Sequence, residues 1–181
     1  MNSAPPQTIL IAPMGDFDPR LLSAVGREIE RVFHAPVCVR PLLEDWSFAF
    51  DAGREQFHST PILRRLADAA PPGVFKILAL ADVDLFIPIL THVYGEAQLG
   101  GKACIVSTHR LNAGSGTHCF SERALARVAK EAIHELGHTF NLRHCPDPAC
   151  VMHYCRSEAD VDRKSSDLCR YCRVMLDDAL R

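Results

Sequence analysis

The sequence predicts an α/β fold with a mixed, twisted sheet and long helices in an N-terminal lobe and a small, cysteine-rich C-terminal lobe. Two observations carry this prediction. Short apolar runs of strand length alternate with amphipathic helical patterns through the first half of the chain, which is typical of α/β domains. Five of the eight cysteines then fall between residues 145 and 172, where Pro146 and Pro148 oppose regular structure.

The first half of the chain alternates strands and helices. The predicted elements are a strand over 8–12, a helix over 20–33, a strand over 37–43, a helix over 59–70 and a strand over 75–81. Ser59, Thr60 and Pro61 form a cap-like start for the second helix. The stretch 44–58 between these elements has no clear periodicity, so we expect a long loop there.

The second half begins with a predicted hairpin and continues into a long helix. Residues 92–97 and 103–107 predict two short strands joined across Gly100 and Gly101, and one of them would be a sheet edge. Gly114–Gly116 predicts a loop. A long helix is expected from about Ser121, its N-cap, to about Asn141, and a last helix over 166–180.

The length and the net charge of the chain limit the functions that the protein can have. The 181 residues suit one domain, with lobes over 1–141 and 142–181, and the formal net charge of -2 argues against nucleic acid or an anionic membrane as a partner. We find no apolar run near the ~20 residues of a membrane span and no signal-peptide pattern at the start. We therefore expect a cytoplasmic monomer, in which clustered cysteines bind metal rather than form disulfides.

The segment His134-Glu135-Leu136-Gly137-His138 matches HExxH and lies inside the long predicted helix. Residues i and i+4 share one helix face, so His134 and His138 can bind one metal ion. Glu135 is rotated about 100° around the helix, which suits a general base acting on water rather than a ligand. The alternative is that all three are ordinary surface residues of a helix.

A third histidine, His144, follows His138 by six residues. It can join the same metal only if the chain turns at about Asn141. The pattern resembles the HExxHxxGxxH of the metzincin clan of zinc metalloproteases, with Asn141 at the position of the glycine. Asparagine is the residue other than glycine that best tolerates the left-handed conformation, so the turn is compatible with this sequence.

The cysteines after His144 extend this resemblance. Cys145, Cys150, Cys169 and Cys172, together with Met152, follow the signature of the archaemetzincin (archaelysin) family of zinc metallopeptidases. Three upstream segments are also similar to that family: Arg54–Ser59, Asp82–Phe86, and the stretch from Val93–Ala97 through Arg110–Leu111. The resemblance covers most of the chain from about residue 8, and it implies a metzincin-like fold with an active-site cleft between the two lobes.

The resemblance implies a role for each of these residues. Zinc would be bound by His134, His138 and His144, Glu135 would be the general base, and Met152 would lie in the turn beneath the metal. A second, structural zinc would be bound by Cys145, Cys150, Cys169 and Cys172. The spacing of the cysteines agrees independently, because four thiolates form a closed tetrahedral site. Two alternatives remain: Cys169 and Cys172 could be a redox pair, and Cys155 could compete as a ligand.

Tyr154 follows Met152 by two residues, as in some other metzincins such as the astacins, whose tyrosine stabilises the oxyanion; its alternative is a packing aromatic. The function implied is zinc-dependent hydrolysis of peptide bonds in a peptide or small protein substrate, with two zinc ions per chain. The alternative function is a non-hydrolytic zinc-binding regulatory or interaction protein on a metzincin scaffold. An intact Glu135 favours the enzyme.

Overall fold

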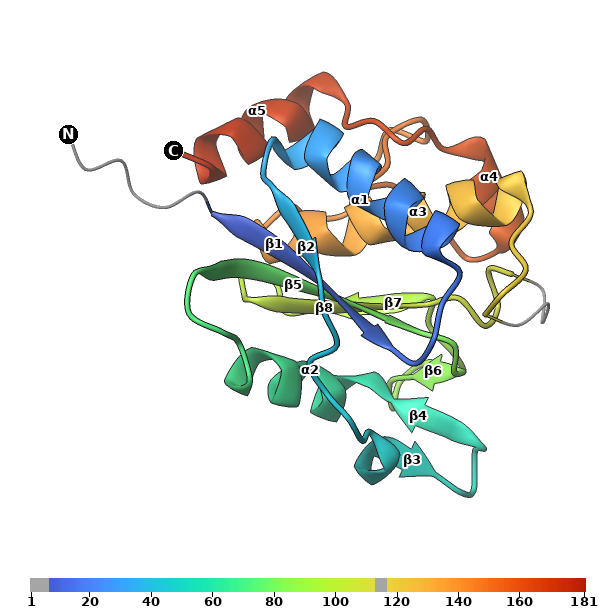
Figure 1. Ribbon diagram of the computed structural model, residues 1–181. Coiled ribbons are helices and arrows are strands. Elements are labelled where there is room, and N and C mark those ends of the chain that lie inside the picture. Colours follow the sequence, from blue (N-terminus) through green and yellow to red (C-terminus); the bar gives the residue numbers. More distant parts are fainter. Residues whose placement is uncertain (1–6, 113–116) are drawn as a thin grey trace.

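A five-stranded sheet forms the centre of the structure, a computed structural model that describes residues 7–112 and 117–181 (Figure 1). In spatial order its strands are β2 (Val37–Val39), β1 (Thr8–Met14), β5 (Val74–Ala81), β8 (Ala103–Ser107) and β7 (Gly95–Ala97). All neighbours pair in parallel except β7, which runs antiparallel to β8 at one edge. The predicted mixed sheet and the predicted hairpin are therefore confirmed.

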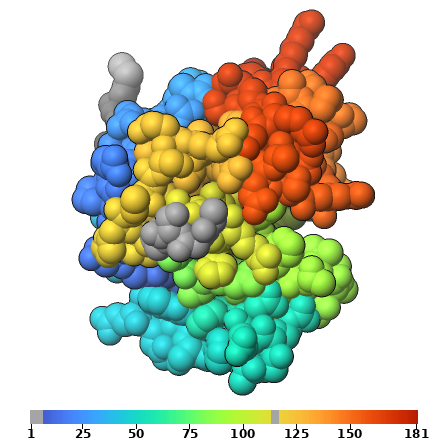
Figure 2. All heavy atoms as spheres, turned by 90° about the vertical axis from the view of Figure 1, so that its right-hand side faces the viewer, coloured from blue at the N-terminus to red at the C-terminus, as the bar shows by residue number. Residues whose placement is uncertain are grey.

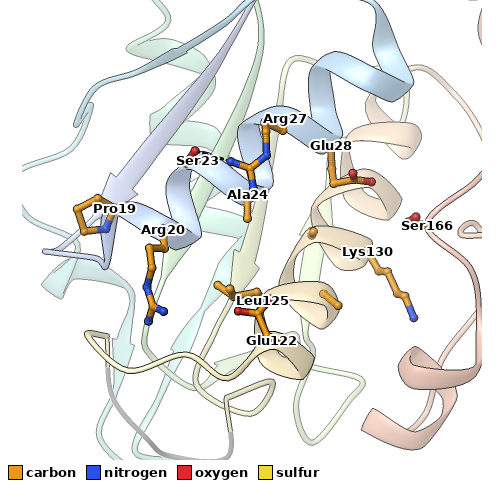
Figure 3. Close-up of a pocket in the computed structure, with 12 residues that line it drawn as sticks. Pro19, Arg20, Ser23, Ala24, Arg27, Glu28, Glu122, Leu125, Lys130 and Ser166 are labelled. Atoms are coloured by element: carbon orange, nitrogen blue, oxygen red, sulfur yellow. Dashed lines mark hydrogen bonds between the residues drawn. The ribbon is translucent and has the colours of Figure 1, made fainter.

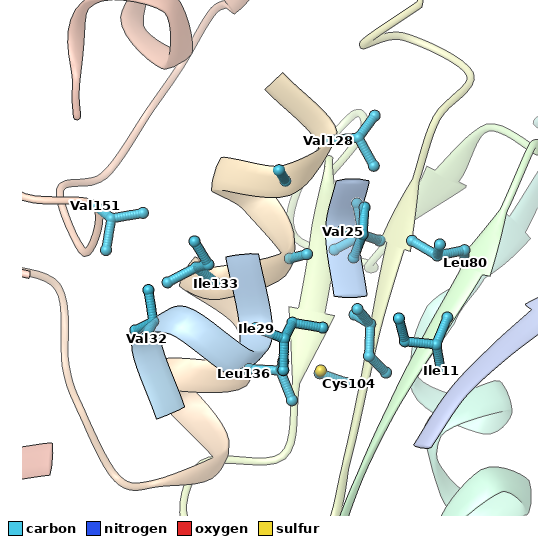
Figure 4. Packing of buried hydrophobic residues seen from close by; sticks show 14 of the residues in the cluster. Ile11, Val25, Ile29, Val32, Leu80, Cys104, Val128, Ile133, Leu136 and Val151 are labelled. Atoms are coloured by element: carbon cyan, nitrogen blue, oxygen red, sulfur yellow. The ribbon is translucent and has the colours of Figure 1, made fainter. Parts of the chain in front are cut away.

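Helices cover both faces of this sheet. Helices α1 (Pro19–Phe33) and α3 (Glu122–Thr139) lie on one face, and α2 (Ser59–Asp68) lies on the other (Figure 1). Between α1, α3 and the sheet, Ile29, Leu136 and Cys104 are fully buried and pack together (Figure 4). Because burying such side chains contributes about 1.5–3 kcal/mol each, this core fixes α3 firmly on the sheet.

The stretch 44–58, which we expected to be a loop, contains short elements. They are a single 3-10 turn, η1 (Ser47–Ala49), and the strands β3 (Phe50–Asp51) and β4 (Gln56–His58). Strand β4 pairs with β3 in antiparallel fashion and with β6 (Leu85–Phe86) in parallel, which gives a second sheet of three strands. This small sheet lies beside α2, below the main sheet in Figure 1.

The C-terminal segment carries two helices where one was predicted. Helix α4 (Glu158–Arg163) begins with a capping box between Ser157 and Asp160, and α5 (Arg170–Ala179) begins later than the expected residue 166. Both lie on the same side of the sheet as α1 and α3 (Figure 1). Of the helices in the two described ranges, none combines the length and hydrophobicity needed to cross a membrane.

Several predicted boundaries need correction. The strand expected over 37–43 ends at Val39, because Pro41 has no N–H to donate to a neighbouring strand. The strand expected over 92–97 begins only at Gly95. Helix α2 does begin at Ser59, but its hydroxyl donates to Glu96 (2.5 Å) instead of capping the helix. The loop expected at Gly114–Gly116 and the first six residues lie outside the described residues.

Candidate metal centre

Helix α3 places two imidazoles side by side with their protons fixed. The Nδ1 atom of His134 is 2.8 Å from the carbonyl oxygen of Val151, and that of His138 is 2.7 Å from the carbonyl oxygen of Leu142. A carbonyl only accepts, so each Nδ1 donates its proton and each Nε2 keeps a lone pair. The two Nε2 atoms lie 3.1 Å apart.

The chain leaves α3 through the turn expected at Asn141. Asn141 has a φ of 66°, and the carbonyl of Gly137 accepts from the amide of Leu142 at 3.1 Å, which closes the helix. The buried Lys76 of β5 donates to the carbonyl of Thr139 at 2.7 Å and so satisfies a further carbonyl at the helix end. The turn brings the ring of His144 to 5.3 Å from that of His134, centroid to centroid.

The three histidines fit a zinc ion. Their ligand atoms all lie within 4.8 Å of one another. A tetrahedral zinc with bonds of about 2.0–2.1 Å sets its nitrogen ligands about 3.3 Å apart, close to the spacing of the His134 and His138 Nε2 atoms. Burial lowers the pKa of His134, His138 and His144, which keeps all three imidazoles neutral, the form that binds metal.

Glu135 is held against the edge strand. Its side chain is buried, and a Cβ atom added at Gly95 of β7 would lie only 2.7 Å from the Glu135 Cγ atom. Glycine at this position therefore allows the strand and the carboxylate to touch. Burial, followed by the nearby charge of Glu131, raises the pKa of Glu135 well above its usual range, so this carboxyl takes up a proton more readily than one in water.

A cleft of about 380 Å³ opens in front of these residues. The face of α3 that carries His134, Glu135 and His138 lines one side together with His144 and Tyr154, and Ile87 and residues 90–97 line the other. In Figure 2 the orange and red C-terminal residues lie directly above the green residues from this second side. The ring of Tyr154 lies 5.1 Å from that of His144 and is 45% exposed.

A wider hollow of about 690 Å³ lies between α1 and α3 (Figure 3). Its described lining residues carry charges of both signs, such as Arg20, Arg27 and Glu28, and include no histidine or cysteine. This hollow therefore offers none of the imidazole donors that line the smaller cleft.

Met152 packs against Gly137, in the turn of α3 between His134 and His138. It is fully buried, and its Sδ atom is 2.5 Å from where a Cβ atom at Gly137 would stand. A side chain at position 137 would displace this methionine, so the glycine and the methionine fit each other.

The second donor group joins four thiols. The Sγ atoms of Cys145, Cys150, Cys169 and Cys172 all lie within 4.8 Å of one another. The Cys145 and Cys169 sulfurs are 3.7 Å apart, close to the spacing of about 3.8 Å that a tetrahedral zinc with 2.3 Å bonds imposes, and far from a disulfide. The fifth thiol, Cys155, lies outside this group and donates to the carbonyl of His153 at 3.6 Å.

The two donor groups share a short piece of backbone. His144 belongs to one and Cys145 to the other. The amide of Cys145 donates to the carbonyl of Met152 at 2.9 Å, and the His153 ring hydrogen-bonds to the Cys145 carbonyl at 2.9 Å. The segment that carries the third histidine is therefore fastened to the turn that carries Met152.

Comparison with known proteins agrees with these geometries. The pattern of Peptidase family M54 matches residues 69–178. The archaemetzincin of Archaeoglobus fulgidus is 36% identical over 151 residues, which are 83% of this chain and 88% of that protein. The chain belongs to the archaemetzincin family. The crystal structure of archaemetzincin from Methanopyrus kandleri has a TM-score of 0.83 and 33% identity, covering 99% of this chain and 98% of that one.

A zinc-dependent peptidase from Methanocorpusculum labreanum is also similar, with a TM-score of 0.72 and 29% identity over 93% of this chain and 99% of that one. Like other archaemetzincins, this chain is a zinc metallopeptidase, and its substrates are peptides. Membership of a peptidase family favours the enzyme over the non-hydrolytic alternative.

In this archaemetzincin the structure also adds residues that sequence reasoning missed. The Lys164 Nζ atom is 2.7 Å from the Glu131 Oε1 atom, and both side chains are almost completely buried. Glu131 lies one helical turn before Glu135 and lines the cleft. In the sequence both look like solvated surface charges, and only the capping box next to Lys164 could have indicated a folded segment there.

Proposed function

We propose that this chain hydrolyses peptide bonds with one zinc ion held by His134, His138 and His144 and with Glu135 as the general base. The observation that supports this best is the convergence of three neutral imidazoles beside a buried carboxylate at the floor of one cleft. The donor set suits zinc, and three protein ligands leave a position for water, as catalytic zinc sites require.

When bound, zinc supplies a Lewis acid that polarises the scissile carbonyl and makes a water nucleophilic at neutral pH. The Glu135 carboxylate accepts the proton of the attacking water and donates it to the departing amine. Its contact with Gly95 fixes where that carboxylate points. No covalent intermediate with a side chain is needed.

We propose that Tyr154 stabilises the oxyanion. Its hydroxyl would donate a hydrogen bond to the carbonyl oxygen as negative charge develops there. The position of the ring next to His144, partly exposed in the cleft, supports this role over that of a packing aromatic.

The substrate would bind along β7. This strand is a sheet edge, so its outer backbone groups are free to pair with an extended peptide in antiparallel fashion near Tyr94–Leu99. The cleft suits a peptide or an unfolded segment of a small protein.

A second zinc, with a structural role, would be held by Cys145, Cys150, Cys169 and Cys172, which gives two zinc ions per chain. We also propose that residues 1–141 and 142–181 form two lobes of one domain that acts as a monomer. A site made of four thiolates needs reduced cysteines, which supports the cytoplasm as its location.

The test is a peptide-library digest with the wild type and Glu135→Gln side by side, with zinc measured in both. The variant should lose hydrolysis and keep two zinc ions per chain, because Glu135 acts on water and not on the metal. Glu122→Gln, an exposed change on the same helix, is the matched control and should keep activity.

Each other outcome has a distinct meaning. Loss of one zinc along with activity would make Glu135 a ligand, and retained activity would remove it from the mechanism. A zinc-loaded wild type that cleaves nothing in the library would favour the alternative, a non-hydrolytic zinc-binding protein.

A further inference from the structure

One side of the cleft, residues 87–94, is built without a regular helix or strand. We call these residues the cleft wall. Its backbone bonds are few: the Leu90 amide donates to the carbonyl of Ile87 and the Val93 amide to the carbonyl of Leu85, both at 2.9 Å. At its end, the Tyr94 carbonyl accepts from the Ser107 amide at 2.8 Å. A segment of this kind opens easily unless other groups hold it.

Side chains from the β4 region hold the cleft wall by its carbonyl groups. The Gln56 Nε2 atom donates to the carbonyl of Thr91 at 2.9 Å, and the Arg54 Nη2 atom donates to the carbonyl of Leu90 at 2.9 Å. The Arg54 guanidinium also lies 4.2 Å from the centroid of the Phe86 ring, which restricts its orientation.

Asp84 anchors these two side chains. Its carboxylate accepts two bonds of 2.7 Å from Arg110 and one of 2.8 Å from Gln56, and the Gln56 Oε1 atom accepts from the Arg54 Nε atom at 3.1 Å. Burial alone would raise the pKa of Asp84, but the bonds from Arg110 and Gln56 outweigh it and keep the pKa below its usual range. We call Arg54, Gln56, Asp84 and Arg110 the polar clamp.

The polar clamp takes its residues from the three upstream segments that the sequence singled out. Arg54 and Gln56 come from the first, Asp84 from the second, and Arg110 from the end of the third, which begins at Val93–Ala97, where the cleft wall runs into β7. Residues distant in sequence therefore come together in the fold, where they support the cleft wall.

We propose that the polar clamp is a substrate-positioning device, which holds the cleft wall in the shape that binds substrate residues C-terminal to the scissile bond. This inference rests on the proposed function. A peptide antiparallel to β7 that is cut beside Gly95 continues, toward its C-terminus, past Tyr94 and along the cleft wall. Ile87 and the part-exposed Leu90 line the cleft there, so the wall favours an apolar substrate side chain.

The polar clamp acts on binding rather than on the chemical step. Arg54 and Gln56 donate to the cleft wall, and Asp84 and Arg110 hold Gln56 in place. None of these bonds reaches the three histidines or Glu135. Loosening the wall should therefore raise KM and leave kcat nearly unchanged, whereas a general loss of structure would lower kcat and zinc content as well.

The experiment compares zinc-loaded Gln56→Met and Arg54→Met with the wild type on two peptides. Both peptides share a sequence that the wild type cleaves, and they differ only in carrying Leu or Gly after the scissile bond. We expect KM for the Leu peptide to rise about tenfold in both variants, with kcat within about twofold of the wild type. The variants should therefore discriminate less between the Leu and Gly peptides. Arg54→Lys, which keeps a donor, should recover part of this loss, and the exposed Arg64→Met on α2 is the control.

A second measurement does not depend on activity. Hydrogen exchange of peptides that cover residues 87–94 should be about tenfold faster in the two Met variants, while exchange in α3 stays as in the wild type. Unchanged exchange and unchanged KM, in an active wild-type background, would overturn the inference.

An inactive wild type would overturn the proposed function and the substrate part of this inference together. The exchange data would then still decide whether the polar clamp holds the cleft wall.

Discussion

At the residue scale, the position of Glu135 depends on the missing side chain at Gly95. The added Cβ atom would lie 2.6 Å from the Ile105 carbonyl oxygen as well as 2.7 Å from the Glu135 Cγ atom. The first of these atoms is backbone in the central sheet and cannot move easily. The carboxylate must give way to relieve the second contact, and the backbone of β7 at Gly95 must shift to relieve the first, so both changes disturb the position of Glu135.

Gly95→Ala should therefore lower kcat by roughly 10–100-fold, because a displacement of about 1 Å in a reacting group has effects of this size. Zinc content should not change. Steady-state kinetics and elemental analysis measure both. Gly26→Ala in α1 is the control, since its Cβ atom would meet Val37 Cγ1 at an ordinary 3.7 Å. Full activity of Gly95→Ala would show that Glu135 is placed by other contacts.

Tyr154→Phe removes one hydroxyl and leaves the ring. If that hydroxyl donates to the oxyanion, kcat should fall by an amount equivalent to about 2–4 kcal/mol in the barrier, with KM little changed. Tyr171→Phe, on a ring that is 80% exposed in α5, is the control. Kinetics identical to the wild type would return Tyr154 to a packing role.

At the scale of elements, the ion pair between Glu131 and Lys164 joins α3 to the segment that follows α4. Two buried charges at 2.7 Å compensate each other, but either one alone would be left in a low dielectric. The segment after α4 can therefore pack against α3 without a penalty only when both charges are present.

Lys164→Met should destabilise the zinc-loaded protein by about 3–5 kcal/mol, because Glu131 remains buried without its partner. The double variant Glu131→Leu/Lys164→Met should recover most of that loss. Urea unfolding measures both, and Arg181→Met, from the exposed pair with Asp178, should change little. A double variant no more stable than Lys164→Met would mean that the pair supports packing and not charge balance.

The sequence predicted long elements better than short ones. The helices expected over 20–33 and 121–141 are observed as Pro19–Phe33 and Glu122–Thr139, because many apolar residues repeat at helical spacing. Strands β3 and β6 have two residues each, too few for any periodicity. Their stability comes from partners that lie far away in the chain.

The same physical reason decides which residues of the site could be predicted from the sequence. That the three histidines and the four cysteines would each come together could be predicted, because their spacing is local, set by one helix and by short loops. Gly95, Lys164 and Arg110 could not, because each acts on a residue from another part of the chain. Only the fold makes those partners neighbours.

At the scale of the whole molecule, two zinc sites would meet at one peptide bond, between His144 and Cys145. Asn141 at positive φ is less favourable than glycine, so the segment that carries His144 depends on an anchor beyond it. A zinc held by the four cysteines would supply that anchor.

Cys172→Ser should therefore weaken zinc binding at the three histidines by roughly 10–100-fold, although Cys172 belongs to the other donor group. Zinc titration of the folded variant measures this, with the exposed Cys38→Ser as control. In the wild type, dialysis against a chelator should remove the histidine-bound zinc first, since that site keeps an open position. Equal affinity in variant and wild type would mean that the sites are independent.

The contact between Gly137 and Met152 changes how the motif itself should be read. In HExxH the two middle positions are written as if any residue could occupy them. Here Leu136 is completely buried in the core, and Gly137 leaves the space that the methionine sulfur fills. All five positions are thus constrained: His134 and His138 by the bonds that fix their rings, Glu135 and Leu136 by burial, and Gly137 by close packing. A motif search that also scores the two middle positions would reject chance HExxH matches whose helix leaves no space for the methionine side chain.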